Sequence, residues 1–346
     1  MKLCPFAIGL VMLAVNPLGS AQAETAEPDS GRIVFQEEND YFVSHDDKNF
    51  TQGIRISYLS ATVTPDGAWD RPYGWLNSVL PIFEGSARKR KYEATVGQSI
   101  FTPTNTATAA PLFKDRPYAA WLYAGASLLQ ETKHPSHNTL ENVELLGGVV
   151  GAAAFGDVTQ NDFHQFVGTQ SSVGWQNQLR IEPGLVLTYE RKWRFAQKLF
   201  GNFAIDAIPE AGASVGNILT YGQIGGMLRF GQNLAADYGP DRIRLSLSGT
   251  AWFDEEQLDG KFGWYVFAGT QGRAVGRNIF LDGNTFATSA NVNKKELVAD
   301  FTGGASLFWS SAARLDFSYI QRTKEFYGQQ GKPDRIGGIN LSFLFW

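Results

Sequence analysis

One histidine of this chain lies in a stretch that predicts a short helix. Asp157 has the character of an N-cap with the polar Gln160 at position N3, and residues 161–167 continue the helix. An apolar stripe runs along this continuation and consists of Phe163, Phe166 and Val167. On such a helix Gln160 and His164 are four residues apart and share a face. If the stripe packs against a neighbouring surface, the face with Gln160 and His164 points at that surface, and the imidazole can accept or donate a proton there. The alternative is a histidine that serves packing, beside a glutamine that closes a capping box.

A second group of polar residues is rich in oxygen atoms. Glu37, Glu38, Asn39 and Asp40 end the first predicted strand, and Thr51 precedes the second. Pairing of these two strands would bring Asn39, Asp40 and Thr51 together. Carboxylate, amide and hydroxyl oxygens are the ligands that a hard cation such as Ca²⁺ accepts. The alternative is a strand end and hairpin made of ordinary turn-forming residues.

The other histidines and one serine motif are weaker candidates. His45 lies beside two aspartates, and His134 and His137 bracket a predicted turn, so we expect solvated side chains, with a metal pair as the alternative for the last two. Residues 212–216 match the G-x-S-x-G pattern, but that motif needs a strand–turn–helix context, which is not predicted here. Without an evident serine partner for His164, an activated water is favoured over a covalent acyl-enzyme.

The composition predicts a large sheet that holds these residues. Of 346 residues, 43% are hydrophobic, 13% are aromatic and 37 are glycine, which excludes disorder; the net charge of -4 argues against nucleic-acid binding through a basic surface. Residues 1–23 have the pattern of a secretory signal peptide, with an A-x-A site that ends at Ala23. Cleavage there would remove Cys4, the sole cysteine, so we expect neither disulfides nor thiol chemistry.

Alternation of apolar and polar residues with period two recurs along residues 24–346. In one segment Ile54, Ile56 and Tyr58 share a face, while Arg55 and Ser57 share the other. Segments of about ten residues with this pattern are typical of a transmembrane antiparallel β-barrel, and no later apolar run is long enough for a helical span. We count about twelve strands, at residues 31–39, 53–61, 91–99, 120–130, 140–151, 182–192, 203–213, 218–230, 261–272, 296–309, 312–323 and 335–346.

A soluble β-sandwich would show the same alternation, but the aromatic residues favour an outer membrane. The chain ends inside a strand, at 343–346, and aromatic girdles mark both interfaces of membrane barrels. Further aromatic residues stand at predicted strand ends, namely Trp121, Trp264, Tyr265 and Trp309.

The even strand count predicts on which side of the membrane each connection lies. If both termini lie in the periplasm, the connections after odd-numbered strands lie outside the cell. These are residues 40–52, 100–119, 152–181, 214–217, 273–295 and 324–334, most of them long, as expected for extracellular loops. Residues 62–90 form a long connection on the other side, which we interpret as a periplasmic excursion without an assigned function.

Several short motifs follow one another through most of the chain. They are FQEEND at 35–40, NFTQG at 49–53, GQSIFTP at 97–103, DRPYAAW at 115–121, QNDFH at 160–164 and GWQNQ at 174–178. Taken together, they resemble the lipid A 3'-O-deacylase family of Gram-negative outer membranes. The resemblance implies a twelve-stranded barrel with an active site between the outer-leaflet end of the wall and a helix in an extracellular loop.

The resemblance also implies roles for individual residues. The family's histidine falls on His164, its glutamine on Gln160, its asparagine–aspartate pair on Asn39 and Asp40, and its threonine on Thr51. The sequence departs from the family pattern in two places. Gln170 stands where some members carry an acid, and Tyr41 rather than a second acid follows Asp40, which argues against a second metal site.

The activity implied by the resemblance is hydrolysis of the 3'-linked acyl ester of lipid A in lipopolysaccharide, by a monomer in the outer membrane. His164 would act as general base on a water that Gln160 orients, while Asn39, Asp40 and Thr51 hold Ca²⁺. Arg116 and Lys114 are candidates to pair with a lipid phosphate. Two alternatives remain, a non-enzymatic pore or structural barrel and an outer-membrane phospholipase with a serine and a histidine.

Overall fold

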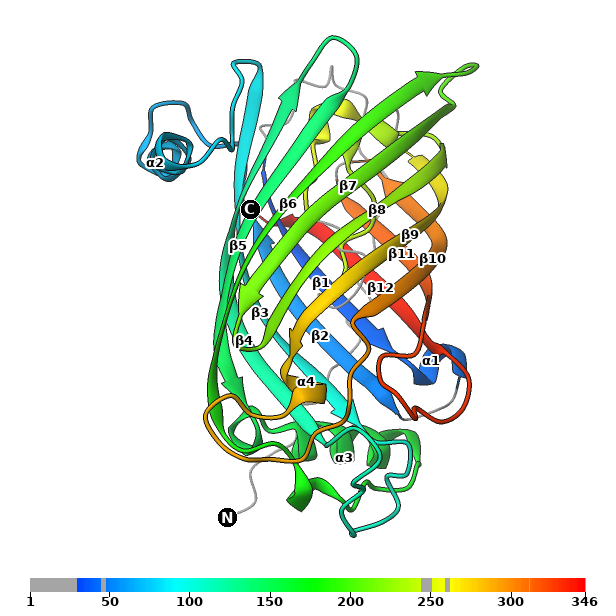
Figure 1. The fold of residues 1–346 in the computed structure, drawn as a ribbon. Helices are drawn as coiled ribbons and strands as arrows, with labels where there is room; N and C mark the ends of the chain where they lie inside the picture. Colours follow the sequence, from blue (N-terminus) through cyan, green and yellow to red (C-terminus); the bar gives the residue numbers. More distant parts are fainter. Residues whose placement is uncertain (1–29, 45–47, 244–250, 259–261, 311, 346) are drawn as a thin grey trace, which may run out of the picture.

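The alternating segments pair into a closed barrel of twelve antiparallel strands in the computed structural model, which describes residues 30–44, 48–243, 251–258, 262–310 and 312–345 (Figure 1). The strands are β1 (Gly31–Asn39), β2 (Asn49–Leu59), β3 (Arg88–Thr102), β4 (Ala119–Lys133), β5 (Asn138–Val150), β6 (Glu182–Lys198), β7 (Ala204–Gly216), β8 (Leu219–Gly231), β9 (Phe262–Asn278), β10 (Leu297–Trp309), β11 (Ala313–Arg322) and β12 (Asp334–Phe345). Pairing of β1 with β12 closes the cylinder. The fold class and strand count predicted from the alternation are confirmed.

Four α-helices lie in the connections of the described residues. They are α1 (Tyr41–Ser44), α2 (Arg71–Val79), α3 (Gly156–Val167) and α4 (Ile279–Asp282). No helix in these parts of the chain is long and apolar enough to cross a bilayer. The signal peptide predicted at 1–23 and the solvated His45 both lie outside the described residues.

The alternation separates a lipid-facing surface from a polar lumen. On β2, Ile56 is exposed on the outer face, whereas Arg55 is buried inside and pairs with Glu93 of β3 at 2.6 Å. Successive side chains of a strand point to opposite faces, so neighbouring aromatic residues cannot both reach lipid. Trp264 and Trp309 lie on the outer face as expected, but Tyr265 and Trp121 are buried inside the barrel, where a girdle position was predicted.

Most of the long connections lie at one end of the barrel, although two long ones, between β2 and β3 and between β8 and β9, lie at the other. Figure 1 shows α1, α3 and α4 at the first of these ends, while the first residue of β1 and the last of β12 pair at the other. Short turns such as 134–137 and 199–203 also lie at the end that holds the strand termini, the end that the sequence analysis expects to be periplasmic. The predicted excursion between β2 and β3 lies at this periplasmic end and carries α2 outside the wall (Figure 1).

The periplasmic connection between β8 and β9 folds back into the lumen, which the sequence did not predict. Arg242 donates to Glu38 of β1 (Nε–Oε1 2.5 Å), and the Tyr238 hydroxyl donates to Glu131 of β4 at 2.8 Å. Asp237 is fully buried among Arg229 of β8, Tyr265 of β9 and Arg314 of β11. Because these partners lie around the whole wall, residues 232–243 and 251–258 form a plug inside the barrel.

Candidate active site

Helix α3 forms where it was predicted, but it begins earlier and buries a different face. Its N-cap is Phe155, in a left-handed conformation with φ of 56°, and Asp157 lies inside the first turn, so the N-cap predicted at Asp157 is wrong. The buried residues of the helix are Gly156, Gln160 and His164. Phe166 is 88% exposed, so the apolar stripe does not pin the helix to the barrel. The face that carries Gln160 and His164 is the one that packs on β3 and β4.

The imidazole of His164 is held by the loop that follows the helix. Its Nδ1 lies 2.8 Å from the carbonyl oxygen of Gln170, and the side chain is 5% exposed. Because a carbonyl oxygen only accepts hydrogen bonds, Nδ1 carries the proton of the neutral ring and Nε2 is the basic nitrogen. The contact uses the backbone of Gln170, so the departure from the family pattern at this position leaves it intact.

Gln160 is oriented by a tryptophan that sequence reasoning missed. Trp175 Nε1 donates to Gln160 Oε1 at 2.8 Å, and the Trp175 ring packs against Tyr118 with centroids 4.9 Å apart. Gln98 of β3, also missed, donates through Nε2 to the carbonyl of Ala154 at 2.6 Å and so ties the α3 loop to the wall. Both residues lie in the motifs at 97–103 and 174–178, which were the available signal.

The α3 loop covers the outer face of the wall, not the lumen. Val96 is 49% exposed on β3. Ile100 lies four residues further along the strand and therefore on the same face. A cross-strand row on this face contains Asn39, Gln52, Ile100 and Ala120. Ile100 and Ala120 pack with Trp175 beneath the loop. Since neighbouring strands lie about 4.8 Å apart, Asn39 is two strands away from the covered part of the wall.

A β-bulge sets the direction of Thr51. The register between β2 and β3 shifts between Phe50 and Gln52, which leaves Thr51 as the extra residue. Its Oγ1 lies 2.6 Å from Oγ1 of Thr102, at the end of β3. Bulges are common beside active sites because they re-aim a side chain without breaking the sheet. Thr51 thereby bonds to the strand on which α3 packs.

The predicted oxygen ligands are buried at the same end of the barrel. Asn39, Asp40 and Thr51 are 2%, 3% and 5% exposed. Asn39 Oδ1 accepts the amide of Tyr41, and Asp40 Oδ2 accepts the amide of Lys48, each at 2.8 Å. The set offers amide, carboxylate and hydroxyl oxygens, whose chemistry fits Ca²⁺. Among the described residues no cluster of three or more His, Cys, Asp or Glu offers an alternative metal site.

The comparisons with known proteins agree with this architecture. The model of the family described as outer membrane protein LpxR matches residues 6–345. The chain belongs to this family. LpxR from Salmonella typhimurium has the same fold, with a TM-score of 0.70 and 18% identity over 91% of this chain and 100% of that one. The resemblance seen in the motifs is confirmed, and the barrel is located in the outer membrane of a Gram-negative bacterium.

Other matches are more distant. The β-domain of the Bordetella autotransporter BrkA reaches a TM-score of 0.43 with 9% identity, over 91% of this chain and 99% of that one. None of the curated proteins matches the sequence.

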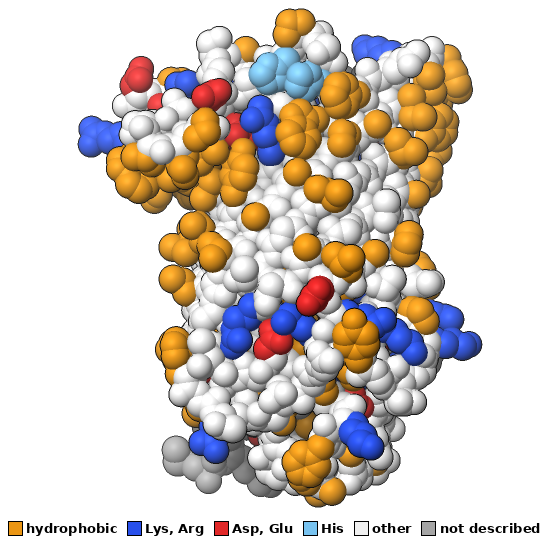
Figure 2. Space-filling model, viewed as in Figure 1, with side chains coloured by type: hydrophobic (Ala, Val, Ile, Leu, Met, Phe, Trp, Pro, Cys, Tyr) orange, Lys and Arg blue, Asp and Glu red, His pale blue; other side chains and the backbone are white. Residues whose placement is uncertain are grey.

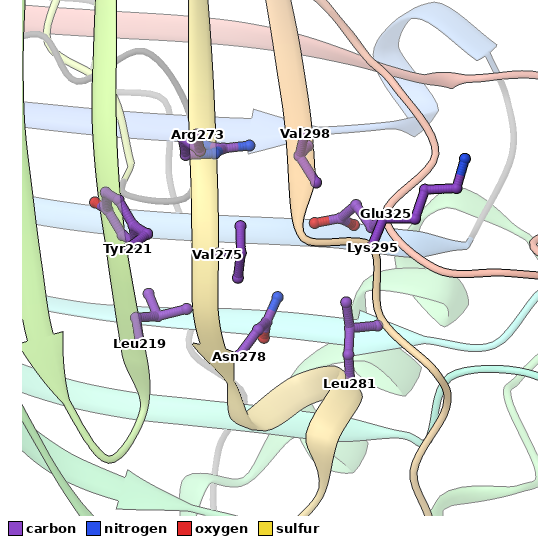
Figure 3. Close-up of a pocket in the computed structure, with 9 residues that line it drawn as sticks. All are labelled: Leu219, Tyr221, Arg273, Val275, Asn278, Leu281, Lys295, Val298 and Glu325. Carbon is purple, nitrogen blue, oxygen red and sulfur yellow. The ribbon is translucent and has the colours of Figure 1, made fainter.

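The two basic residues expected to meet phosphate have different surroundings in this LpxR-family chain. Arg116 is 1% exposed and donates through Nη2 to Glu325 at 2.7 Å. Glu325 lines a cavity of about 10 Å³ between β8, β9 and β10 (Figure 3), room for about one water. We therefore assign no phosphate to Arg116, contrary to the expectation from sequence. Lys114 is exposed and lines a groove of about 750 Å³ with Asn293 and Tyr327 of two other extracellular connections.

The remaining sequence candidates lie away from α3. His134 and His137 stand at the periplasmic end, with their rings stacked 4.7 Å apart. The serine of the G-x-S-x-G match, Ser214, lies within β7, and its hydroxyl bonds to Thr188 of β6 at 2.7 Å. A nucleophile elbow needs a turn into a helix, which this strand does not provide.

Gly156 sets how closely α3 approaches the wall, and we expect Gly156→Ala to displace the helix. A Cβ at this position would lie 2.4 Å from Cβ of Ala120 and 2.7 Å from the Trp175 ring. The wall is rigid sheet, so the helix must move. Amide hydrogen exchange in residues 156–167 should become faster, as helix packing protects it. The control is Val158→Ala, whose side chain is 53% exposed; equal exchange in the two variants would contradict the prediction.

Proposed function

We propose that this chain is an outer-membrane esterase that removes the 3'-linked acyl or acyloxyacyl group from lipid A of lipopolysaccharide. One observation carries the proposal: a buried histidine with a defined basic nitrogen lies between the outer face of the wall and an extracellular helix. Membership of the LpxR family and the Salmonella LpxR fold support it.

The proposed reaction is attack of water on the ester carbonyl. Nε2 of His164 accepts a proton from the water as the oxygen attacks, and the tetrahedral intermediate then expels the sugar 3'-oxygen. The proton passes from the imidazole to this leaving oxygen, so that the products are a carboxylic acid and a free 3'-hydroxyl. Gln160 positions the water or the imidazole, and its own orientation is set by Trp175.

Asn39, Asp40 and Thr51 are the residues that would hold Ca²⁺ in this proposal. When bound, the ion would polarise the ester carbonyl as a Lewis acid, or would bind a lipid phosphate. Lys114, exposed at the extracellular groove, is the remaining candidate for pairing with a phosphate.

The position of the site suits a lipid substrate. If lipid A reaches His164 from the outer face of the wall, its acyl chains stay in the outer leaflet during the reaction. A soluble enzyme would have to transfer these chains out of the bilayer, at about 0.8 kcal/mol per CH₂. The lateral site avoids this cost.

Mass spectrometry of lipid A tests the function. Cells that express the protein should contain lipid A lacking the 3'-linked group, and purified protein should produce the same loss. Unchanged lipid A in both experiments would reject the proposal. Sulfonyl fluorides distinguish the phospholipase alternative, because they inactivate serine nucleophiles, whereas a water-based mechanism should resist them.

The plug leads us to expect no pore activity. Ion pairs and hydrogen bonds link residues 232–243 to β1, β4, β8, β9 and β11 inside the lumen, and Glu255 pairs with Arg32 of β1. In planar bilayers the protein should give no stable single-channel conductance in 1 M salt. Open channels of uniform size would instead favour the pore alternative.

A further inference from the structure

The excursion between β2 and β3 is rigidly fixed to the outside of the barrel. Tyr73 of α2 is fully buried, and its hydroxyl donates to the carbonyl oxygens of Lys91 and Leu129 on β3 and β4. Asp70, just before the helix, pairs with Arg90 of β3 at 2.7 Å. The orientation of α2 relative to the wall is therefore set by side-chain bonds at both strands.

Helix α2 has an apolar face that extends beyond its contact with the wall. Tyr73 and Leu76 pack toward the barrel, in a cluster with Ile82, Phe83 and the wall residues Leu128, Val143 and Tyr189. At 3.6 residues per turn, Trp75 and Val79 continue this apolar arc, but they are 65% and 58% exposed. The opposite arc carries small or polar residues, namely Arg71, Gly74, Asn77 and Ser78.

The exposed apolar side chains point toward the membrane level of the barrel. In Figure 2 hydrophobic side chains gather on the side of the excursion that faces the middle of the barrel, and charged side chains lie on its opposite side. Leu80, which follows the helix, and Trp69, which precedes it, are 51% and 60% exposed. A face with this direction meets the lipid beside the wall and not the open periplasm.

The excursion also continues the aromatic girdle of the periplasmic end. The ring centroid of Tyr58 lies 5.9 Å from that of Phe345 and 6.3 Å from that of Tyr92. Trp69 stacks on Tyr92 with ring centroids 4.7 Å apart. Aromatic side chains in such a girdle sit at the boundary between headgroups and acyl chains. The row of rings therefore extends this boundary from β12, β2 and β3 onto residue 69, directly before α2.

We infer that α2 and the residues that flank it form an interfacial anchor, whose exposed apolar residues insert into the periplasmic leaflet of the outer membrane; they are Trp69, Trp75, Val79 and Leu80. The occupant of this face is phospholipid at the headgroup–acyl boundary, which amphipathic helices with tryptophan on the apolar face prefer. Arg71, exposed on the polar arc, is placed to meet lipid phosphates. This assigns a role to the 62–90 excursion and does not depend on the proposed catalytic function.

Spin labels on opposite arcs of α2 test the inference. In a Cys4→Ser background, Trp75→Cys and Asn77→Cys each receive a nitroxide, and the folded proteins are reconstituted into phosphatidylethanolamine–phosphatidylglycerol vesicles. The label at 75 should be more accessible to oxygen, which partitions into lipid, and less accessible to a water-soluble nickel chelate than the label at 77. Heat-modifiable migration in gel electrophoresis confirms that both variants are folded barrels.

The opposite result would overturn the inference. A label at 75 that meets the nickel chelate as readily as the label at 77 would place the apolar face in water, open to a periplasmic protein. A measurement without labels uses brominated phospholipids, which quench tryptophan fluorescence on contact. The quenched fraction should decrease in Trp75→Phe relative to the unmodified chain, and an unchanged fraction would equally contradict insertion.

Discussion

His164→Ala is expected to lower lipid A deacylation by about 10²- to 10⁴-fold, the contribution of a positioned general base. The physical reason is that Nε2, made basic by the bond from Nδ1 to the Gln170 carbonyl, has no replacement in the variant. The measurement is the rate of 3'-acyl release from lipid A by purified protein, followed by mass spectrometry. His164 belongs to a helix in a connection and not to a strand, so the barrel should still fold.

Two further variants make this result specific. His134→Ala removes a histidine at the periplasmic end and should leave the rate unchanged. Trp175→Phe keeps an aromatic ring but removes the donor to Gln160, so it should reduce the rate less than His164→Ala does. Full activity in a folded His164→Ala protein would remove the base assignment, while loss of the heat-modifiable form would show a folding defect instead.

Asp40→Asn is expected to give the second-largest effect, a decrease of about 100-fold at low micromolar Ca²⁺, because loss of the ion forfeits several kcal/mol of transition-state charge stabilisation. Asp40 supplies the one formal negative charge among the three proposed ligands. An asparagine oxygen can still accept the Lys48 amide, so the loop should keep its conformation. Because the affinity is weakened, millimolar Ca²⁺ should restore part of the activity.

Chelation provides the complementary measurement. EGTA should abolish the deacylation activity of the unmodified protein, and added Ca²⁺ should restore this activity. The matched control is Asp282→Asn, which removes an acid of α4 that pairs with Lys294 at 3.0 Å at the same end of the barrel. Persistence of full activity in EGTA, or equal effects of the two substitutions, would argue against the calcium role of Asp40.

Much of the barrel follows from the sequence because strand periodicity is local. A strand exposed to lipid on one face and to a polar lumen on the other must alternate, so residues 53–61 and 335–346 indicate β2 and β12 without knowledge of their partners. Strand ends are less well determined. β3 begins at Arg88 and not near residue 91, and β2 begins at Asn49 and not at 53, since pairing with neighbours extends both strands beyond the alternating core.

The sequence by itself determined the fold class, the end of the barrel at which each connection lies, and the residues Asn39, Asp40, Thr51, Gln160 and His164 as the candidates for chemistry. Only the tertiary structure decided which face of α3 is buried, that Arg116 pairs with Glu325, and that the β8–β9 connection forms a plug. Hydrophobic periodicity predicts burial of an apolar stripe, but the buried face of α3 carries Gly156, Gln160 and His164. The Arg116–Glu325 pair and the plug depend on contacts between residues more than a hundred positions apart, which no local pattern encodes.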